Sequence, residues 1–363
     1  MALPALLLVT AAAVQGARQR EPNVNNDPTR ALVPPRAWQR RWSDDEDLES
    51  LTDLVEPAAP FEIHGYLRTS FIHSDDVNAS PGGRVDAFSM DGLRMFFRSE
   101  IGDWRFHATL RGDQRVDTGS FGIADTFGDV RMPEIWGMYE VFDEVYLRVG
   151  RFRAPFLTSA LQEENTILFY NRPWMGTEWA FSDEGVALDG HYGPLRGWLA
   201  VQDGNDNKGN HVAVTARAAL DILGDGVHQQ YDGARDPKRD LALTAAAAMY
   251  YDTDDNNFSS QAAELRLAWN RFFVGAEVTD RGDGFGSLLY WSGFASVMIT
   301  KDLELAAGFD DFERSDATES WRGSLSYYFV GNNAKVQVVY TDSTSNAPLA
   351  AGETIVLGVT TGF

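Results

Sequence analysis

LRMFFRSEIGDWRFHATLR, residues 93–111, is the stretch that decides the fold. Leu93, Met95, Phe97 and Ile101 share one face, opposite Arg94, Arg98 and Glu100, and a second series of alternating apolar residues begins at Trp104. Strict alternation is the pattern of a β-strand with one apolar face, because successive side chains point to opposite sides. Only Gly102-Asp103 separates the two series, which is typical of a two-residue hairpin. The stretch therefore predicts two antiparallel strands with one apolar and one charged face.

The same alternation continues over most of the chain. Beyond the hairpin it begins at Phe61–Phe71, where Phe61, Ile63 and Leu67 share a face, and it predicts about sixteen strands in all. The other expected strands are 133–142, 144–152, 185–192, 194–203, 211–221, 240–251, 261–269, 271–281, 287–299, 302–312, 319–330, 334–342 and 353–363.

The connections between these strands alternate in length. Tight turns, as at Gly193 and Asn270, alternate with longer polar loops. The expected loops are 73–91, 113–130, 153–184, 204–210, 252–260, 281–286, 313–318 and 343–352. Outer-membrane barrels have short periplasmic turns and long outer loops. The connection at 222–239 breaks this rule, so either it holds an extra element or the strand count slips there.

Aromatic residues near the strand ends indicate a membrane. We expect two interfacial girdles on the outward face. The turn-side set is Trp104, Tyr192, Trp269, Phe272 and Phe329, and the loop-side set is Tyr139, Tyr251, Trp291 and Trp321. The last strand alternates up to Phe363 and resembles the C-terminal signature that the outer-membrane assembly machinery reads. A soluble all-β protein is the rival interpretation.

These patterns predict the fold class and the organisation of the chain. The fold is an all-β, transmembrane antiparallel β-barrel of about 16 strands in the bacterial cell outer membrane, in contact with outer-membrane lipid. Residues 1–17 are expected to be a signal peptide because of their apolar run, residues 18–60 a disordered or partly helical periplasmic segment, and residues 61–363 the barrel.

Composition excludes several classes of function. The formal charge of -22 argues against a nucleic-acid partner, and the absence of cysteine removes thiolate metal sites and thiol nucleophiles. The six histidines show no metal-ligand spacing, so no cofactor, metal site or catalytic residue is expected. Residues 203–209 and Asp252–Asp255 carry spaced acidic oxygens, but a solvated polar loop explains both better than a calcium site.

Barrels of 16–18 strands enclose an aqueous channel, and the predicted inward face is charged. Two interpretations stay open: an anion path along weak sites, or arginines that pair with inward carboxylates and brace the wall. Arg94, Arg98, Arg105 and Arg111 are the best candidates for an unpaired track. The pore-lining set is Arg68, Arg94, Arg98, Arg105, Arg111, Arg148, Arg196, Arg217 and Arg322.

The longest loop, 153–184, is expected to be the constriction. It is rich in bulky apolar residues, which favours folding inward against the wall. Its charges, Arg153, Glu163, Glu164 and Arg172, would then face a narrowed lumen. A lid over the barrel mouth and a contact with a neighbouring subunit are the alternatives.

Around this loop the sequence resembles the phosphate-selective porin O and P family. The resemblance rests on VGRFRAPF at 149–156, FYNR at 169–172 and GVALDG at 185–190. It implies a sixteen-stranded, homotrimeric channel, often one that favours anions. Asn171 stands where the family commonly has Glu, and Ser182 where it has Arg.

The sequence thus predicts an outer-membrane porin and no enzyme. Small hydrophilic solutes or ions would diffuse passively through a water-filled, arginine-lined channel, with anion preference as an open question. An outer-membrane barrel enzyme (lipase or protease) and a structural or adhesive barrel are the alternatives.

Overall fold

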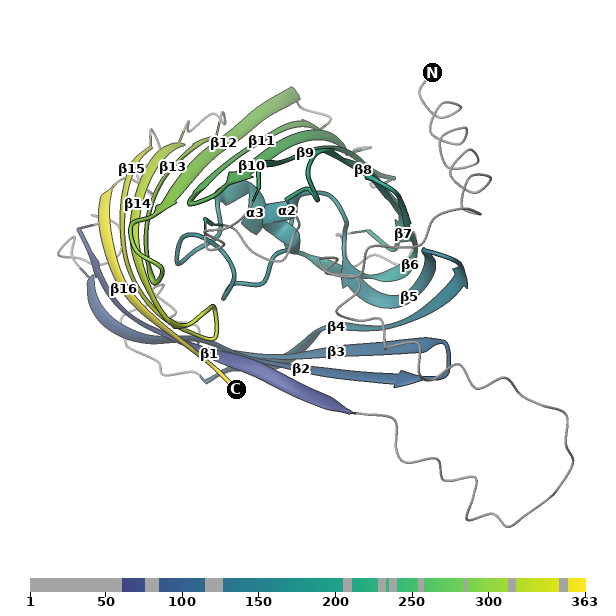
Figure 1. The fold of residues 1–363 in the computed structure, drawn as a ribbon, viewed down its shortest axis with the longest axis horizontal. Coiled ribbons are helices and arrows are strands. Elements are labelled where there is room, and N and C mark those ends of the chain that lie inside the picture. Colours follow the sequence, from purple (N-terminus) through teal and green to yellow (C-terminus); the bar gives the residue numbers. More distant parts are fainter. Residues whose placement is uncertain are drawn as a thin grey trace, which may run out of the picture.

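Sixteen antiparallel strands form the wall of the molecule in a computed structural model (Figure 1). The structure describes residues 61–75, 85–114, 127–204, 211–227, 233–234, 240–253, 258–283, 286–312, 318–345 and 352–363. The strands are β1 (Glu62–Ser74), β2 (Val85–Ile101), β3 (Trp104–Gln114), β4 (Phe127–Phe142), β5 (Val145–Arg153), β6 (Ser182–Tyr192), β7 (Leu195–Gln202), β8 (Ala213–Leu223), β9 (Ala242–Asp252), β10 (Ser259–Trp269), β11 (Phe272–Asp283), β12 (Gly286–Met298), β13 (Leu303–Phe312), β14 (Thr318–Val330), β15 (Ala334–Ser345) and β16 (Gly352–Gly362).

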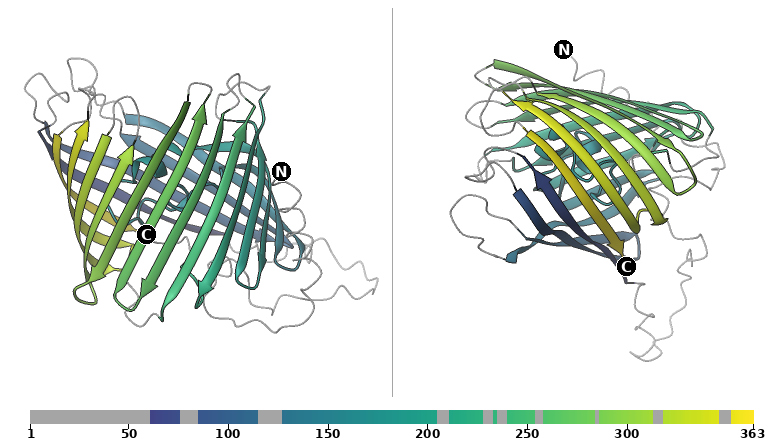
Figure 2. Two further views of the ribbon diagram at one scale, coloured as in Figure 1. Left: turned by 90° about the horizontal axis from the view of Figure 1, so that it is seen from above. Right: turned by 90° about the vertical axis from the view of Figure 1, so that its left-hand side faces the viewer.

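Each strand pairs with its neighbours in the sequence, and β16 returns to β1 to close the barrel. Phe71 lies opposite Leu357 in this closing pair. Beyond the end of β16, Gly65 and Phe363 exchange two backbone hydrogen bonds of 3.0 Å. The predicted fold class and strand number are confirmed, and the strands tilt strongly across the barrel (Figure 2).

Two strands begin earlier than the alternation predicts. β2 starts at Val85 and β4 at Phe127, inside the stretches expected to be loops. In β2 the pairing with β1 skips Asp91, because a bulge shifts the register between Arg68 and Thr69. A bulge adds one residue and reverses the phase of alternation, so the first half of such a strand is hidden in the sequence. β4 has a similar irregularity opposite Thr109 and Arg111.

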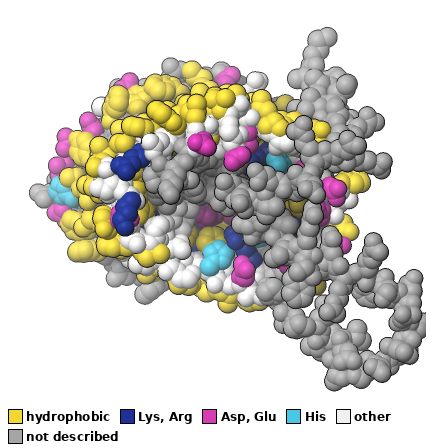
Figure 3. All heavy atoms as spheres, in the orientation of Figure 1, with side chains coloured by type: hydrophobic (Ala, Val, Ile, Leu, Met, Phe, Trp, Pro, Cys, Tyr) yellow, Lys and Arg dark blue, Asp and Glu magenta, His cyan; other side chains and the backbone are white. Residues whose placement is uncertain are grey.

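The outer surface is apolar along the strands, as Figure 3 shows around the circumference. Leu265, Val274 and Leu357, for example, are each more than two-fifths exposed. Outward aromatics mark both ends: Trp291 and Trp321 flank Phe309 on the loop side, with ring centroids 4.8 and 4.5 Å from it.

One girdle residue was assigned to the wrong end. Tyr139 packs on Trp104, with ring centroids 5.2 Å apart, at the turn side rather than the loop side. Tyr139 lies close to the end of β4 that leads into the short turn, so its position in the sequence already places it on the turn side.

The predicted number of strands is correct on both sides of the long connection at 222–239, because β8 and β9 are directly paired. Residues 1–60 lie outside the described residues, and so do the expected signal peptide and N-terminal segment. Two short helices, α2 (Thr158–Leu161) and α3 (Trp174–Glu178), belong to the loop after β5. No helix in the described ranges is long and apolar enough to cross a membrane.

Candidate functional site: the constriction loop

The segment between β5 and β6, residues 154–181, folds into the barrel as the sequence predicts. It carries α2 and α3 and lies inside the ring of strands (Figure 1). Phe156 and Leu157 are fully buried, and Trp179 is 4 % exposed. Trp179 packs against Tyr250 of β9, with ring centroids 5.0 Å apart. Apolar burial therefore holds one side of the loop against β8–β12.

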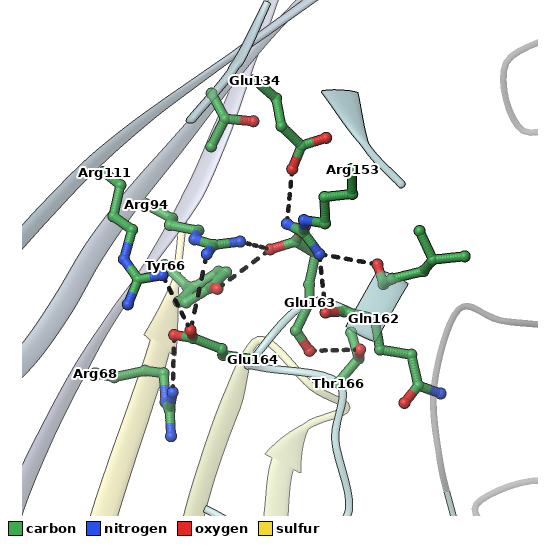
Figure 4. A network of polar contacts seen from close by, with 12 residues as sticks. Tyr66, Arg68, Arg94, Arg111, Glu134, Arg153, Gln162, Glu163, Glu164 and Thr166 are labelled. Carbon is green, nitrogen blue, oxygen red and sulfur yellow. Dashed lines mark hydrogen bonds and ion pairs between the residues drawn. The ribbon is translucent and has the colours of Figure 1, made fainter. Parts of the chain in front are cut away.

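Glu163 holds the opposite side of the loop to β1–β5 (Figure 4). It accepts hydrogen bonds from Arg94 of β2 and, at 2.5 Å, from Arg153 at the end of β5. Arg153 also lies 2.7 Å from a carboxylate oxygen of Glu134 of β4. Burial alone would raise the pKa of Glu163, but the charges of Arg153, Arg94 and Arg172 hold it well below its usual range.

Glu164 is bound by three arginines of the first three strands (Figure 4). Arg68 lies 3.0 Å, Arg111 3.3 Å and Arg94 3.7 Å from its carboxylate oxygens. Burial opposes the charged form, yet the cations outweigh it and lower the pKa of Glu164 to about 2. The loop thus inserts two carboxylates into a concentration of arginines on the wall.

Two guanidinium groups near this cluster are held differently. Arg172 donates to the backbone oxygens of Ser159, at 2.5 Å, and Gln162. Burial and the neighbouring charge of Arg153 lower the pKa of Arg172 to about 10. Arg98 lies on the inner wall beside Glu62 in the strand register. Neither guanidinium forms an ion pair with a carboxylate of the described chain.

A second anchor joins α2 to β8, β10 and β11. The backbone amide of Thr158 donates to Glu264 at 3.1 Å, and Ser159 donates to Glu277 from its amide at 3.2 Å and its hydroxyl at 2.6 Å. Arg217 pairs with Glu264, and Arg266 lies 2.7 Å from Glu277. The two wall carboxylates accept the first amides of α2, which have no partner within the helix.

A third anchor holds the middle of the loop to β14 and β15. The backbone oxygen of Ile167 accepts from Lys335 at 3.2 Å, and that of Leu168 accepts from Gln337 at 3.2 Å and Ser324 at 3.2 Å. Because buried carbonyl groups need donors, these wall residues allow irregular backbone inside the barrel.

Two glycines of the wall provide space for aromatic rings of the loop. A Cβ atom on Gly308 would lie 2.8 Å from the ring of Phe169, and one on Gly358 would overlap the ring of Tyr170. Any side chain at either position would therefore occupy the place of the ring. We refer to Gly308 and Gly358 as the seats of the loop, because each leaves room on the wall for one of its aromatic rings.

Most of the predicted pore-lining arginines are paired. Arg105 lies 3.7 Å from Glu100, Arg196 3.2 Å from Asp221 and Arg322 2.5 Å from Asp310, and Arg148 pairs with Asp189. The expectation of an unpaired track is wrong for three of its four members. Arg94 and Arg111 bind the loop and Arg105 binds its hairpin partner strand, so only Arg98 is left. Most of these arginines are therefore paired with carboxylates of the wall or of the loop.

Other details of the predicted site also need correction. Arg153 is the last residue of β5 rather than part of the loop. Asn171 is exposed, and its backbone oxygen accepts from Arg322 at 3.3 Å. Glu134, Glu264 and Glu277 lie at inward positions of the strand alternation, but no pattern in the sequence marks them as loop anchors. Lys335 and Gln337 could have been noticed as inward polar residues. No sequence signal shows which loop carbonyl each of them meets.

Comparison with known proteins supports the fold of the chain but does not assign the chain to a family. No protein-family profile and no curated protein matches the chain. Among solved structures, an anion-selective porin from Comamonas acidovorans aligns with a TM-score of 0.60 and 11% identity over 84% of this chain and 100% of that one. The OmpF protein of Salmonella typhi, in complex with daunomycin, aligns with a TM-score of 0.59 and 12% identity over 84% and 98%. The outer membrane channel DcaP of Acinetobacter baumannii gives 0.55 and 11% over 84% and 98%.

The chain therefore has the fold of the outer-membrane porins. Its closed wall and apolar outer surface place it in the bacterial outer membrane, as predicted.

Proposed function

We propose that this protein is an outer-membrane porin through which small hydrophilic solutes or ions diffuse passively. One observation carries the proposal: a sixteen-stranded wall whose inner face is charged surrounds a loop that is anchored at three places across the lumen. Charged side chains at membrane depth require water or counter-charges. A loop fixed in this way narrows the channel to a set width.

A preference for anions is the finer part of the proposal. The cluster around Glu163 and Glu164 contains more arginines than carboxylates, and Arg98 and Arg172 lie beyond ion-pair distance of every carboxylate among the described residues. A surplus of positive charge at a narrow point raises the local concentration of anions. The paired arginines elsewhere contribute little to selectivity, since their charge is balanced.

Planar-bilayer recording tests the proposal directly. We expect discrete conductance steps from the purified protein. In a potassium chloride gradient, the sign of the reversal potential should show that chloride is more permeant than potassium. Absence of steps together with lipid or peptide hydrolysis would favour the barrel enzyme. Absence of both would favour a structural or adhesive barrel.

Charge-removing variants locate the selectivity. Arg172→Gln and Arg98→Gln should each shift the reversal potential toward cations. Lys301→Gln removes the same charge from an exposed turn, where the side chain is 85 % exposed, and should leave the potential unchanged. Equal shifts in all three variants would contradict a site at the constriction.

Assembly as a homotrimer and membership of the phosphate-selective porin O and P family remain part of this proposal. The sequence motifs around the constriction loop support the family. The mass of the detergent-solubilised protein tests the trimer. Competition of phosphate with chloride in the bilayer experiment tests whether the channel shares the selectivity in that family's name.

A further inference from the structure

The connection between β8 and β9 is far longer than the other turns on its side of the barrel. Of its residues the structure describes Gly224–Val227, Gly233–Ala234 and Asp240–Leu241, and the first two stretches contain buried residues. Val227 is 5 % and Ala234 3 % exposed. Both belong to the apolar cluster that contains Leu168, Phe169 and Tyr170 of the constriction loop. Both stretches therefore reach the barrel interior from the turn side.

The amide of Ala234 is held by a side chain of the wall four strands away from β9. It donates to Oε1 of Glu304 in β13 at 2.7 Å. Ser296 of β12 donates to the same oxygen at 2.7 Å, and Tyr328 of β14 donates to Oε2 at 2.6 Å. Glu304 is 1 % exposed. Its carboxyl group thus makes three hydrogen bonds, and one of them goes to the connection between β8 and β9.

Gly233 fits this contact closely. Its φ is +117°, a conformation that favours glycine, and a Cβ atom there would lie 2.6 Å from Oε1 of Glu304. No other residue could bring the backbone so near the carboxyl group without displacement. We refer to Gly233, Ala234 and Glu304 as the β13 latch.

Two consecutive hydrogen bonds hold the first stretch, Gly224–Val227, to the wall. The amide of Val227 donates to the hydroxyl of Thr244 at 2.7 Å, which in turn donates to Asp221 at 2.7 Å. Val227 and Thr158 of α2 both line a pocket against Arg196, Trp198 and Arg217 of the wall. The free space below the constriction loop is thus bounded on one side by the β8–β9 connection.

We propose that Val227 and Ala234, the second held by the β13 latch, form a second narrow point of the channel and limit the size of permeating solutes together with the constriction loop. The inference rests on the proposed channel function. Its physical basis is the one seen at α2: a wall carboxyl group accepts backbone amides of an inserted segment, which satisfies buried donors inside the barrel.

A cysteine reporter tests the latch without recording a current. The chain has no cysteine, so Ala234→Cys provides a single thiol. We expect this thiol in the folded protein to react with a water-soluble maleimide far more slowly than Lys301→Cys, which lies on an exposed turn. Adding Glu304→Ala should speed the reaction roughly 10- to 100-fold, the factor for losing a hydrogen bond to a charged group.

Two further variants control for misfolding. Glu304→Gln keeps an acceptor oxygen and should label nearly as slowly as the native background. Gly233→Val leaves the wall unchanged but meets Glu304, so it should speed labelling as Glu304→Ala does. The heat-dependent shift of the barrel on a gel verifies that each variant is folded.

Bilayer recording then tests the narrowing. Glu304→Ala and Gly233→Val should raise the single-channel conductance and admit larger neutral polyethylene glycols, whereas Glu304→Gln should not. Fast labelling of Ala234→Cys in the native background, or unchanged conductance in both latch variants of a conducting barrel, would overturn the inference. If the native protein gave no steps, the proposed function would fail, and the labelling result would still decide whether the latch exists.

Discussion

Single charged residues in this barrel act mostly as members of ion pairs rather than as free charges. Glu163 illustrates the point, because Arg94 and Arg153 both direct guanidinium groups at it from different strands. Removing one member of such a set leaves the others with uncompensated charge. The site should therefore be destabilised by the removal of either a positively or a negatively charged side chain.

Glu163→Gln keeps the shape of the side chain and removes its charge. We expect it to lower the free energy of unfolding by about 1.5–3 kcal/mol, the range for hydrogen bonds to charged groups. Urea unfolding in detergent micelles measures this. Glu178→Gln is the control in the same loop, since its carboxylate is 49 % exposed and pairs with Arg281 at the rim. Equal losses in both variants would contradict the anchoring role.

The loop should also loosen in acid. The pKa of Glu163 is below its usual range and that of Glu164 is lowered to about 2. Carboxyl groups with lowered pKa values stabilise the folded state above their unfolded pKa of about 4.3, and the contribution is lost as pH falls toward the folded value.

Hydrogen exchange in residues 160–170 measures this dependence. We expect protection to stay constant from about pH 8 to about pH 5 and to fall below about pH 4. In Glu163→Gln the acid-induced change should be smaller. A loss of protection that began near neutral pH would show that these carboxylates are not the titrating groups.

At the scale of elements, the loop and the wall are shaped to each other. Phe169 and Tyr170 occupy spaces that exist only because Gly308 and Gly358 have no side chains. Polar groups of β14 and β15 meet the adjoining carbonyl groups of the loop. The seat is therefore formed by shape and hydrogen bonds together.

Gly358→Val should displace the ring of Tyr170 from its seat. Overpacking of this kind costs about 1–3 kcal/mol, and we expect it to appear as faster hydrogen exchange in residues 165–172. Gly323→Val is the matched control, because nothing lies within 4 Å of a Cβ atom there. If both substitutions left exchange in the loop unchanged, Gly358 would have no role as a seat.

Across the whole molecule, the wall has no free edge, because β1 pairs with β16. Gly65 and Phe363 complete this seam with two hydrogen bonds, and the ring of Phe363 would lie 2.8 Å from a Cβ atom on Gly65. A barrel satisfies its backbone groups in lipid only when such a seam is closed.

Phe363→Ala should weaken closure while leaving the lumen unchanged. We expect a lower temperature for the heat-dependent shift of the folded barrel on a gel, with the same single-channel conductance for molecules that do fold. Phe363→Tyr keeps the ring and should behave as the native protein does. A variant Phe363→Ala with native heat resistance would show that the ring does not support the seam.

The wall could be predicted from the sequence and the site only in part. Period-two alternation is local, so it located β10 and β13 within a few residues. It failed where bulges reversed its phase, as at Asp91 in β2. The inward folding of the loop followed from its apolar residues. Its ion pairs did not, since Glu164 meets Arg68 across 96 positions of sequence.

The three anchors of the constriction loop also constrain the order of folding. The loop follows β5, yet its contacts on the wall include Lys335 and Gly358 near the far end of the chain. Such long-range contacts form late, because the intervening chain must first be brought together. The last strands to arrive thus complete both the seam and the loop's binding surface. We expect a newly inserted barrel to pass through a transient stage in which the channel is wider and more permeable, before the constriction loop is fixed in place.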